Sequence, residues 1–262
     1  MGERLPGPIC GTKQGNYWID EGTMCLARSN SPGSIGIVAT PVAAYDVDVV
    51  GVNLSGGIPF AVGQASMVRI PVPGTNGLAI ELSPRGYVPA SGSTSTLFFQ
   101  DPTGKRHLRL DYGYNVKTKT IDYHWNQKGT FTDFSVADHT SVGRAGQTAY
   151  KAAKYFRYGG RVLVVVGVAV DVISIVQASK PLRRASEVVA GWAGAWVGCK
   201  VIGAGGAFIG TAASPLGTAV GGIGGCIIGG IGGYLGGSIL AAEVYDWAED
   251  TFFTPLPEMS AP

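Results

Sequence analysis

Charged residues are scarce in this chain, since they make up 15% of its 262 residues. An average soluble protein has about 25%. Hydrophobic residues reach 45%, and this combination excludes a disordered tail and a coiled coil. The 41 glycines do not recur at every third position, which excludes collagen. A net charge of only +2 gives no support to nucleic acid as a partner.

Cysteines are also few, and their spacing fits neither a disulfide-rich scaffold nor a zinc site. We therefore expect no metal and no other cofactor. Cys10 and Cys25 could pair in an oxidising compartment, although two free thiols are the simpler expectation. Cys199 and Cys226 lie in apolar stretches and are expected to act as small hydrophobic residues. The first residues lack the apolar run of a secretory signal, so we expect export to need a dedicated secretion system.

The few charges are unevenly distributed. Residues 145–200 carry eight basic and two acidic side chains, whereas residues 201–262 carry five acidic side chains and no basic one. Such asymmetry predicts parts of the chain with different physical roles.

The N-terminal half has the pattern of an antiparallel β domain over residues 35–135, after an irregular lead-in at 1–34. Short β-branched runs separated by Gly, Pro and Asn predict strands at 35–39, 47–52, 67–71, 78–82 and 97–100. Strands of this length and spacing are typical of a sandwich or a small barrel. With the helices expected in the second half, the predicted fold class is α+β.

A hairpin predicted at 107–112 and 121–126 collects polar side chains on one face, because successive residues of a strand point to opposite sides. That face holds His107, Arg109, Asp111, Asp122, His124 and Asn126. If Asp111 opposes Asp122, then Arg109 opposes His124. The simpler interpretation is a solvated sheet face with ordinary cross-strand pairing. The alternative is an acid–base site whose catalytic residues are His107, Arg109, Asp111 and His124.

Residues 142–158 predict a basic amphipathic helix. Lys151, Lys154 and Arg157 recur at intervals of three, with Ala153 and Phe156 on an apolar side. Lysines next to aromatic residues are typical of helices that lie on an anionic bilayer, and we expect these three cations to contact lipid. An ordinary surface helix is the alternative.

Three apolar stretches follow within residues 160–250, at about 162–179, 188–213 and 216–242. The 42 residues from Val201 to Ala242 contain no charge and are interrupted by Ser214-Pro215. Two helices of about twenty residues that fold back at this proline would be long enough to cross a bilayer. Asp171 and Lys200 are the exceptions, and ionisable groups within membrane segments are often functional.

Glycines at intervals of four are the most specific signal in the chain. In the third stretch and, in shorter copies, the second, they predict a stripe where another helix backbone approaches closely. The residues expected at this contact are Gly194, Gly198, Gly206, Gly210, Gly217, Gly221, Gly225, Gly229, Gly233 and Gly237. A helical hairpin buried in a soluble domain is the alternative to membrane insertion.

The segment Ala190-Gly-Trp-Ala-Gly-Ala-Trp-Val-Gly-Cys-Lys and the glycines at 217–237, followed by Tyr245-Asp-Trp-Ala-Glu, resemble the glycine-zipper tails of bacterial polymorphic toxins. Leu108-Arg-Leu-Asp-Tyr and His124-Trp-Asn are similar to segments near the C-terminal parts of such toxins. These toxins are effectors secreted by type VI or Rhs-type systems.

The resemblance implies an antibacterial effector that acts at a target-cell membrane, inserting into it and permeabilising it through its helices. The implied partners are the lipid bilayer, further copies of the chain, and an immunity protein or delivery chaperone. The second hypothesis is a toxin enzyme, a nuclease or other hydrolase, that uses the polar strip at 107–124 and needs the hydrophobic hairpin only for delivery.

Overall fold

The computed structural model describes residues 12–14, 17–19, 26–28, 56–83 and 94–252. The chain divides into two compact units, Met1–Leu54 and Ser55–Pro262. In the first unit, β1 (Thr12–Gln14), β2 (Tyr17–Ile19) and β3 (Leu26–Arg28) form an antiparallel sheet with β2 in the middle. The irregular lead-in expected at 1–34 therefore contains a small sheet, centred on the β-prone triplet Tyr17-Trp18-Ile19. The strands expected at 35–39 and 47–52 lie outside the described residues.

The second unit contains a six-stranded antiparallel sheet in which each strand pairs with the next along the chain. Its strands are β4 (Ile70–Pro71), β5 (Ala79–Leu82), β6 (Thr94–Gln100), β7 (Arg106–Asn115), β8 (Thr120–Gln127) and β9 (Thr140–Ser141). A short helix, α3 (Phe131–Phe134), precedes β9. The six strands make one sheet and not the expected sandwich or barrel, because helices cover its apolar face: Ile80 and Phe99 belong to the same buried core as Ala153 and Ala219.

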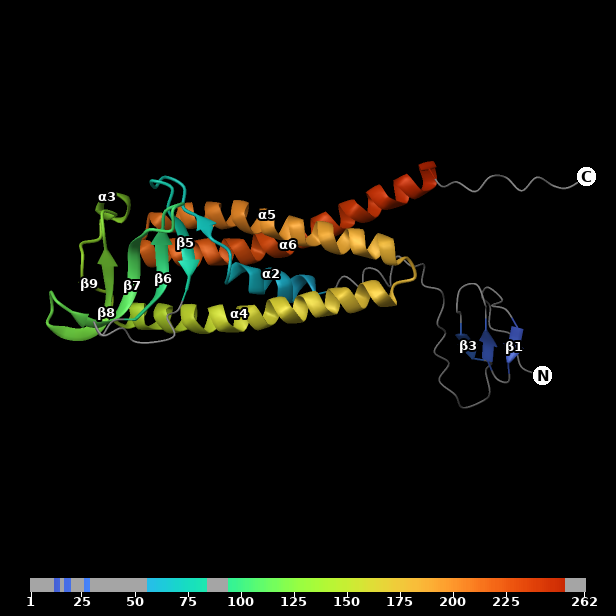
Figure 1. The fold of residues 1–262 in the computed structure, drawn as a ribbon, viewed down its shortest axis with the longest axis horizontal. Helices are drawn as coiled ribbons and strands as arrows, with labels where there is room; N and C mark the ends of the chain where they lie inside the picture. The colour runs from blue at the N-terminus through green and yellow to red at the C-terminus, as the bar shows by residue number, and fades with distance from the viewer. Residues whose placement is uncertain (1–11, 15–16, 20–25, 29–55, 84–93, 253–262) are drawn as a thin grey trace, which may run out of the picture. The chain divides into compact units, whose positions relative to one another are not determined.

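Three long helices follow the sheet: α4 (Gly143–Gln177), α5 (Pro181–Thr211) and α6 (Pro215–Phe252). Successive helices run antiparallel to each other, so α4 and α6 run in the same direction, and all three extend well beyond the sheet (Figure 1). The predicted α+β fold class is therefore confirmed. The chain bends at Ser214-Pro215 as expected, with Pro215 at the start of α6, where its missing N–H is tolerated. The basic helix expected at 142–158 continues without a break into the first apolar stretch as α4.

Another helix, α2 (Gly57–Ala65), was not predicted. Its nine residues are packed against α4, α5 and α6 (Figure 1). Pro59 lies in its first turn, where no intrahelical N–H bond is lost. The Ser55-Gly56-Gly57 sequence reads locally as a turn, so the helix depends on the surface that the long helices offer it.

Candidate membrane-inserting bundle

The long helices expose many of their apolar side chains, and each is long and apolar enough to cross a membrane. Val165 and Val176 on α4 are 68% and 76% exposed, and Ile209 on α5 is 77% exposed. Further exposed apolar residues of the three helices include Val162, Val172, Ile173, Val189, Val197, Val201, Phe208, Val220, Ile228, Ile239, Leu240 and Val244. Apolar patches of this extent mark surfaces that contact protein or lipid.

Glycines bring the backbones of α5 and α6 into direct contact. A Cβ added to Gly194 or Gly198 would overlap the carbonyl oxygen of Gly233 or Gly229. The same holds for Gly206 against Gly221 and for Gly210 against Gly217, while Gly225 faces Ile202 and Gly237 faces Ala190. All ten glycines singled out in the sequence therefore lie at the α5–α6 contact, where a larger residue would force the helices apart.

A second glycine contact joins α2 to α4. A Cβ on Gly63 would meet the carbonyl oxygen of Gly160, and a Cβ on Gly56 would overlap that of Gly167. Gly160 and Gly167 are seven positions apart, so they lie on the same side of α4. The spacing of four used to find the other glycines does not detect this pair.

Cys199 and Cys226 form a disulfide between α5 and α6. The expectation that both would act only as small hydrophobic residues was therefore wrong. The glycine contacts on either side bring the two helices close enough for their cysteines to meet. The pairing is invisible in the sequence because it depends on the register of two helices. Cys10 and Cys25 lie outside the described residues.

Asp171 is a fully buried carboxylate inside the apolar bundle. Its Oδ1 accepts hydrogen bonds from the Gly56 backbone N–H at 2.8 Å and from the Tyr234 hydroxyl at 2.9 Å. Its Oδ2 accepts one from the Trp192 indole N–H at 2.8 Å. These donors come from the start of α2, from α5 and from α6, so one side chain of α4 links all the helices of the bundle. Hydrogen-bonded in this way, a buried carboxylate is tolerated in apolar surroundings.

Charged residues gather where α4 passes into α5, at the end of the bundle far from the sheet. Arg183 donates to both carboxylate oxygens of Asp246, at 2.8 and 2.9 Å. The buried Glu187 accepts from Arg183 and from Arg184, the latter at 2.9 Å. Lys180 donates to Glu249 at 2.7 Å, and this hydrogen bond raises the pKa of Lys180. The acidic end of α6 thus neutralises the basic start of α5.

The three cations expected at a lipid surface do not lie together. Lys151 and Lys154 are exposed on α4. Arg157 instead turns toward the protein, where its Nη1 donates to the carbonyl oxygen of Ser66 at 2.8 Å. On α5, the Lys200 ammonium lies 3.9 Å from the centre of the Trp196 ring, which keeps the charge at the helix surface.

The polar strip of the sheet has the expected faces but a different register. Asp111 pairs with His124 and Arg109 with Asn126, so the predicted Asp111–Asp122 and Arg109–His124 pairs are wrong. Strand β7 runs on to Asn115, whose side chain caps the turn by accepting from the backbone N–H groups of Lys117 and Thr118. The shift is of two residues, which leaves each side chain on its predicted face.

The structure also divides this strip into two separate clusters. His107 pairs with Asp101 at 2.9 Å, and hydrogen bonds from Thr103 and His107 hold the pKa of Asp101 well below its usual value. The other cluster is buried and joins neighbouring strands: Asp111 accepts from Ser95 at 2.6 Å and from Arg109 at 3.0 Å.

His124 belongs to this buried cluster, with its Nδ1 2.9 Å from an Asp122 oxygen and its ring 5.2 Å from that of His139. His124 and Asp111 are 1% and 0% exposed, so a substrate reaches neither of them in this conformation. The four residues considered as catalytic thus do not form one accessible site. Among the described residues, no group of three or more His, Cys, Asp or Glu side chains could hold a metal ion.

Comparison of the chain with family models, curated proteins and solved structures found no match.

Proposed function

We propose that the protein is a secreted antibacterial effector that inserts its helical bundle into the membrane of a target cell and permeabilises it. One observation supports this most directly: α4, α5 and α6 present apolar side chains outward, including Val165, Val189 and Ile239. Removing apolar surface from water lowers the free energy by about 25 cal/mol per Å². A bilayer is the environment in which so many outward-facing apolar side chains are stable.

Lys151 and Lys154 supply the first contact in this proposal, since they lie on the exposed side of α4 and attract anionic lipid. The glycine-packed hairpin then enters as a preformed unit. Because its ten glycines already pack α5 against α6 within one chain, association between copies uses the outward faces of the helices. An immunity protein or a delivery chaperone would cover the same apolar faces in the producing cell.

Dye release from anionic liposomes tests the membrane activity. Two double variants are compared. In the first, Gly229→Ala/Gly233→Ala, each new Cβ would overlap a backbone carbonyl of α5. In the control, Gly232→Ala/Gly236→Ala, no atom lies within 4 Å of either new Cβ. The first variant is expected to lose dye release and the second to keep it, although both make the same chemical change, three positions apart along α6. Absence of release by the unaltered protein at micromolar concentration would remove the proposal.

Expression in a bacterial host tests the effector role. Growth arrest accompanied by loss of membrane potential is expected for the unaltered chain. The Gly229→Ala and Gly233→Ala double variant is expected to be harmless, because its hairpin cannot close. Normal growth and membrane potential with the unaltered protein in the membrane fraction would contradict toxicity.

A hydrolase remains the second candidate, because His124 and Asp111 face each other on adjacent strands with His139 close by. Their burial favours a structural role over catalysis. His124→Gln separates the two: an enzyme would lose toxicity while its membrane binding stays intact, whereas a membrane-acting effector would retain toxicity as long as it folds.

A further inference from the structure

We infer that the bilayer covers only the half of the helical bundle farther from the sheet, and that the sheet and the neighbouring halves of α4, α5 and α6 stay outside on one side. This inference rests on the proposed insertion and adds where the membrane surfaces lie. It follows from the positions of exposed charges on α4, from the depth at which the helices contact one another, and from what the sheet covers.

The charges of α4 define the thickness of the membrane-embedded segment. Arg161 is the last exposed cation of its basic half and Lys180 follows the end of the helix, 19 positions later. The 16 positions from Arg161 to Gln177, where α4 ends, make about 24 Å of helix at about 1.5 Å per residue, and three further residues lead to Lys180. This length is close to the hydrocarbon thickness of about 30 Å. The one charged residue between them, Asp171, is buried and hydrogen-bonded. The half of α4 nearer the sheet exposes Lys151 and Lys154, which lipid tails cannot solvate.

On α5 and α6, charged residues mark the two ends of the membrane-embedded segment at the same heights along the bundle as on α4. Gly160 on α4 contacts Gly63 of α2, and Gly198 on α5 contacts Gly229 on α6, while Ala61 of α2 lies against Gly230. These contacts place Arg161 near the depth of Lys200, two positions after Gly198. At the other end Arg183 pairs with Asp246. From Arg183 to Lys200 there are 17 positions, or about 26 Å of helix.

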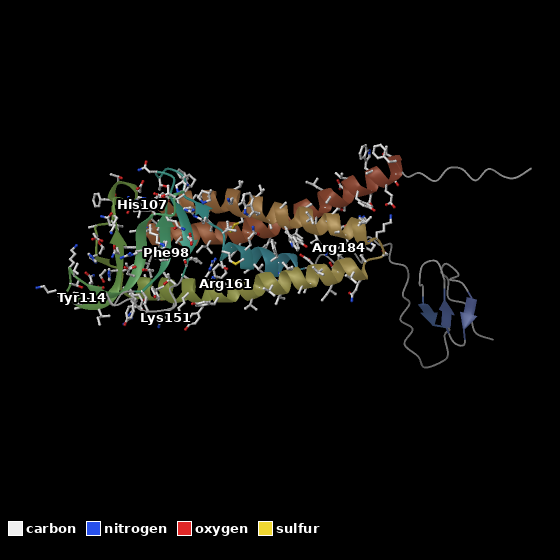
Figure 2. The ribbon with its side chains drawn as sticks, in the orientation of Figure 1. Phe98, His107, Tyr114, Lys151, Arg161 and Arg184 are labelled. Atoms are coloured by element: carbon white, nitrogen blue, oxygen red, sulfur yellow. A yellow bond between two sulfur atoms is a disulfide. The ribbon has the colours of Figure 1, made fainter. Side chains whose placement is uncertain are left out.

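Aromatic side chains occur at both limits, as they do at membrane surfaces. Tyr158 and Trp196, which are 42% and 49% exposed, lie near Arg161 and Lys200. Trp247 is 62% exposed and follows Asp246 at the opposite limit. Figure 2 shows Lys151 beside the sheet, Arg161 farther along α4, and Arg184 toward the opposite end of the bundle.

The sheet prevents lipid from surrounding the remaining half. Ile70 of β4 packs against Gly203, and Ile80 of β5 packs against Gly222. Both contacts lie beyond Lys200 in the direction of the α5–α6 turn. Since β4 and β5 continue into the polar strip of β7 and β8, sinking this half into the bilayer would bury charges such as Arg109 and Asp101.

Nitroxide labels on single exposed cysteines test this placement in anionic vesicles. Cys10 and Cys25 are first replaced by serine, while the Cys199–Cys226 disulfide is kept. Val165→Cys on α4 and Ile239→Cys on α6 probe the half expected in lipid, and Ile209→Cys on α5 probes the half expected in water; the native side chains are 68%, 55% and 77% exposed. Each variant must unfold at the temperature of its parent.

At Val165 and Ile239, oxygen is expected to enhance the spin relaxation of the label several-fold more than a water-soluble nickel chelate does. At Ile209 the nickel chelate is expected to give the larger enhancement. If all three sites report lipid, the bundle inserts completely and the inferred boundary is wrong, although insertion stands. If all three report water, both the boundary and the proposed membrane function are wrong.

Discussion

The hydroxyl of Tyr234 donates a 2.9 Å hydrogen bond to the carboxylate of Asp171, and this joins the middle of α6 to α4 inside an apolar bundle. Trp192 and the Gly56 backbone N–H complete the environment of the carboxylate. The bundle therefore has a polar centre that fixes how its helices align. Apolar contacts alone would allow the same helices to slide or rotate more freely.

Removing the Tyr234 hydroxyl should destabilise this centre. Tyr234→Phe leaves Asp171 buried with one donor fewer, and a lost hydrogen bond to a charged group costs about 1.5–3 kcal/mol. We expect a lower unfolding temperature in detergent. Tyr155→Phe is the control, because Tyr155 is 69% exposed and its change should leave the unfolding temperature the same. Equal effects of the two substitutions would show that the Asp171 contact contributes nothing.

Two neighbouring glycines of α4 should respond in opposite directions to alanine. A Cβ on Gly160 would overlap the Ser66 side chain of the α2 region, whereas a Cβ on Gly159 meets nothing within 4 Å. Gly160→Ala should displace α2 and expose its backbone to hydrogen exchange. Gly159→Ala should stabilise α4 by about 1 kcal/mol, the usual gain in helix propensity. A loss of α2 protection in both variants, or in neither, would contradict the docking described.

Two glutamates at the far end of the bundle should differ in their effect on stability. Glu187 is 4% exposed and bonds Arg183 and Arg184, so Glu187→Gln leaves buried guanidinium charge and should cost about 3 kcal/mol. Glu249→Gln breaks a pair whose side chains are 55% and 38% exposed, and should cost much less because solvent screens surface ion pairs. Denaturant unfolding of both variants measures the difference. A larger loss of stability for Glu249→Gln than for Glu187→Gln would contradict the prediction that the buried ion pairs contribute more.

The disulfide should stabilise the α5–α6 hairpin. Replacing both Cys199 and Cys226 by alanine removes a cross-link between residues 27 positions apart, worth about 3.5 kcal/mol on chain-entropy grounds. Adding a reductant to the unaltered protein should lower its unfolding temperature, but it should not change that of the double variant. If the unaltered protein unfolds at the same temperature with and without reductant, the bond contributes nothing to stability.

Membrane docking should depend on Lys151 and Lys154 and not on Arg157. Changing both lysines to glutamine should weaken binding to anionic vesicles by at most about 2 kcal/mol, or about 30-fold, at about 1 kcal/mol per charge near the surface. Binding to zwitterionic vesicles should stay the same. Arg157→Gln should instead lower stability, because Arg157 bonds the carbonyl oxygen of Ser66. Equal weakening on both kinds of vesicle would rule out an electrostatic role for the lysines.

The sequence predicted the long helices because their signals are local: Val201 to Ala242 contains no charge, and Pro215 marks the bend between two helices. It did not predict α2, because the Gly56 backbone N–H before this helix donates to Asp171, which lies 115 positions away. The strand faces followed from alternation, but the register depended on the Asn115 turn. The burial of His124 could not be predicted, since it depends on side chains from neighbouring strands and from the loop that holds His139.

The position of α2 has a consequence for how the chain matures on the ribosome. Its residues emerge before those of the other bundle helices, yet the groups that hold it, Asp171 and Tyr234, are made 115 and 178 residues after Gly56. Domains near the N-terminus usually fold while synthesis continues. Here α2 has to wait until α6 is translated past Tyr234. A nascent chain released before that point lacks the last member of the polar centre, so a truncated product cannot complete the bundle.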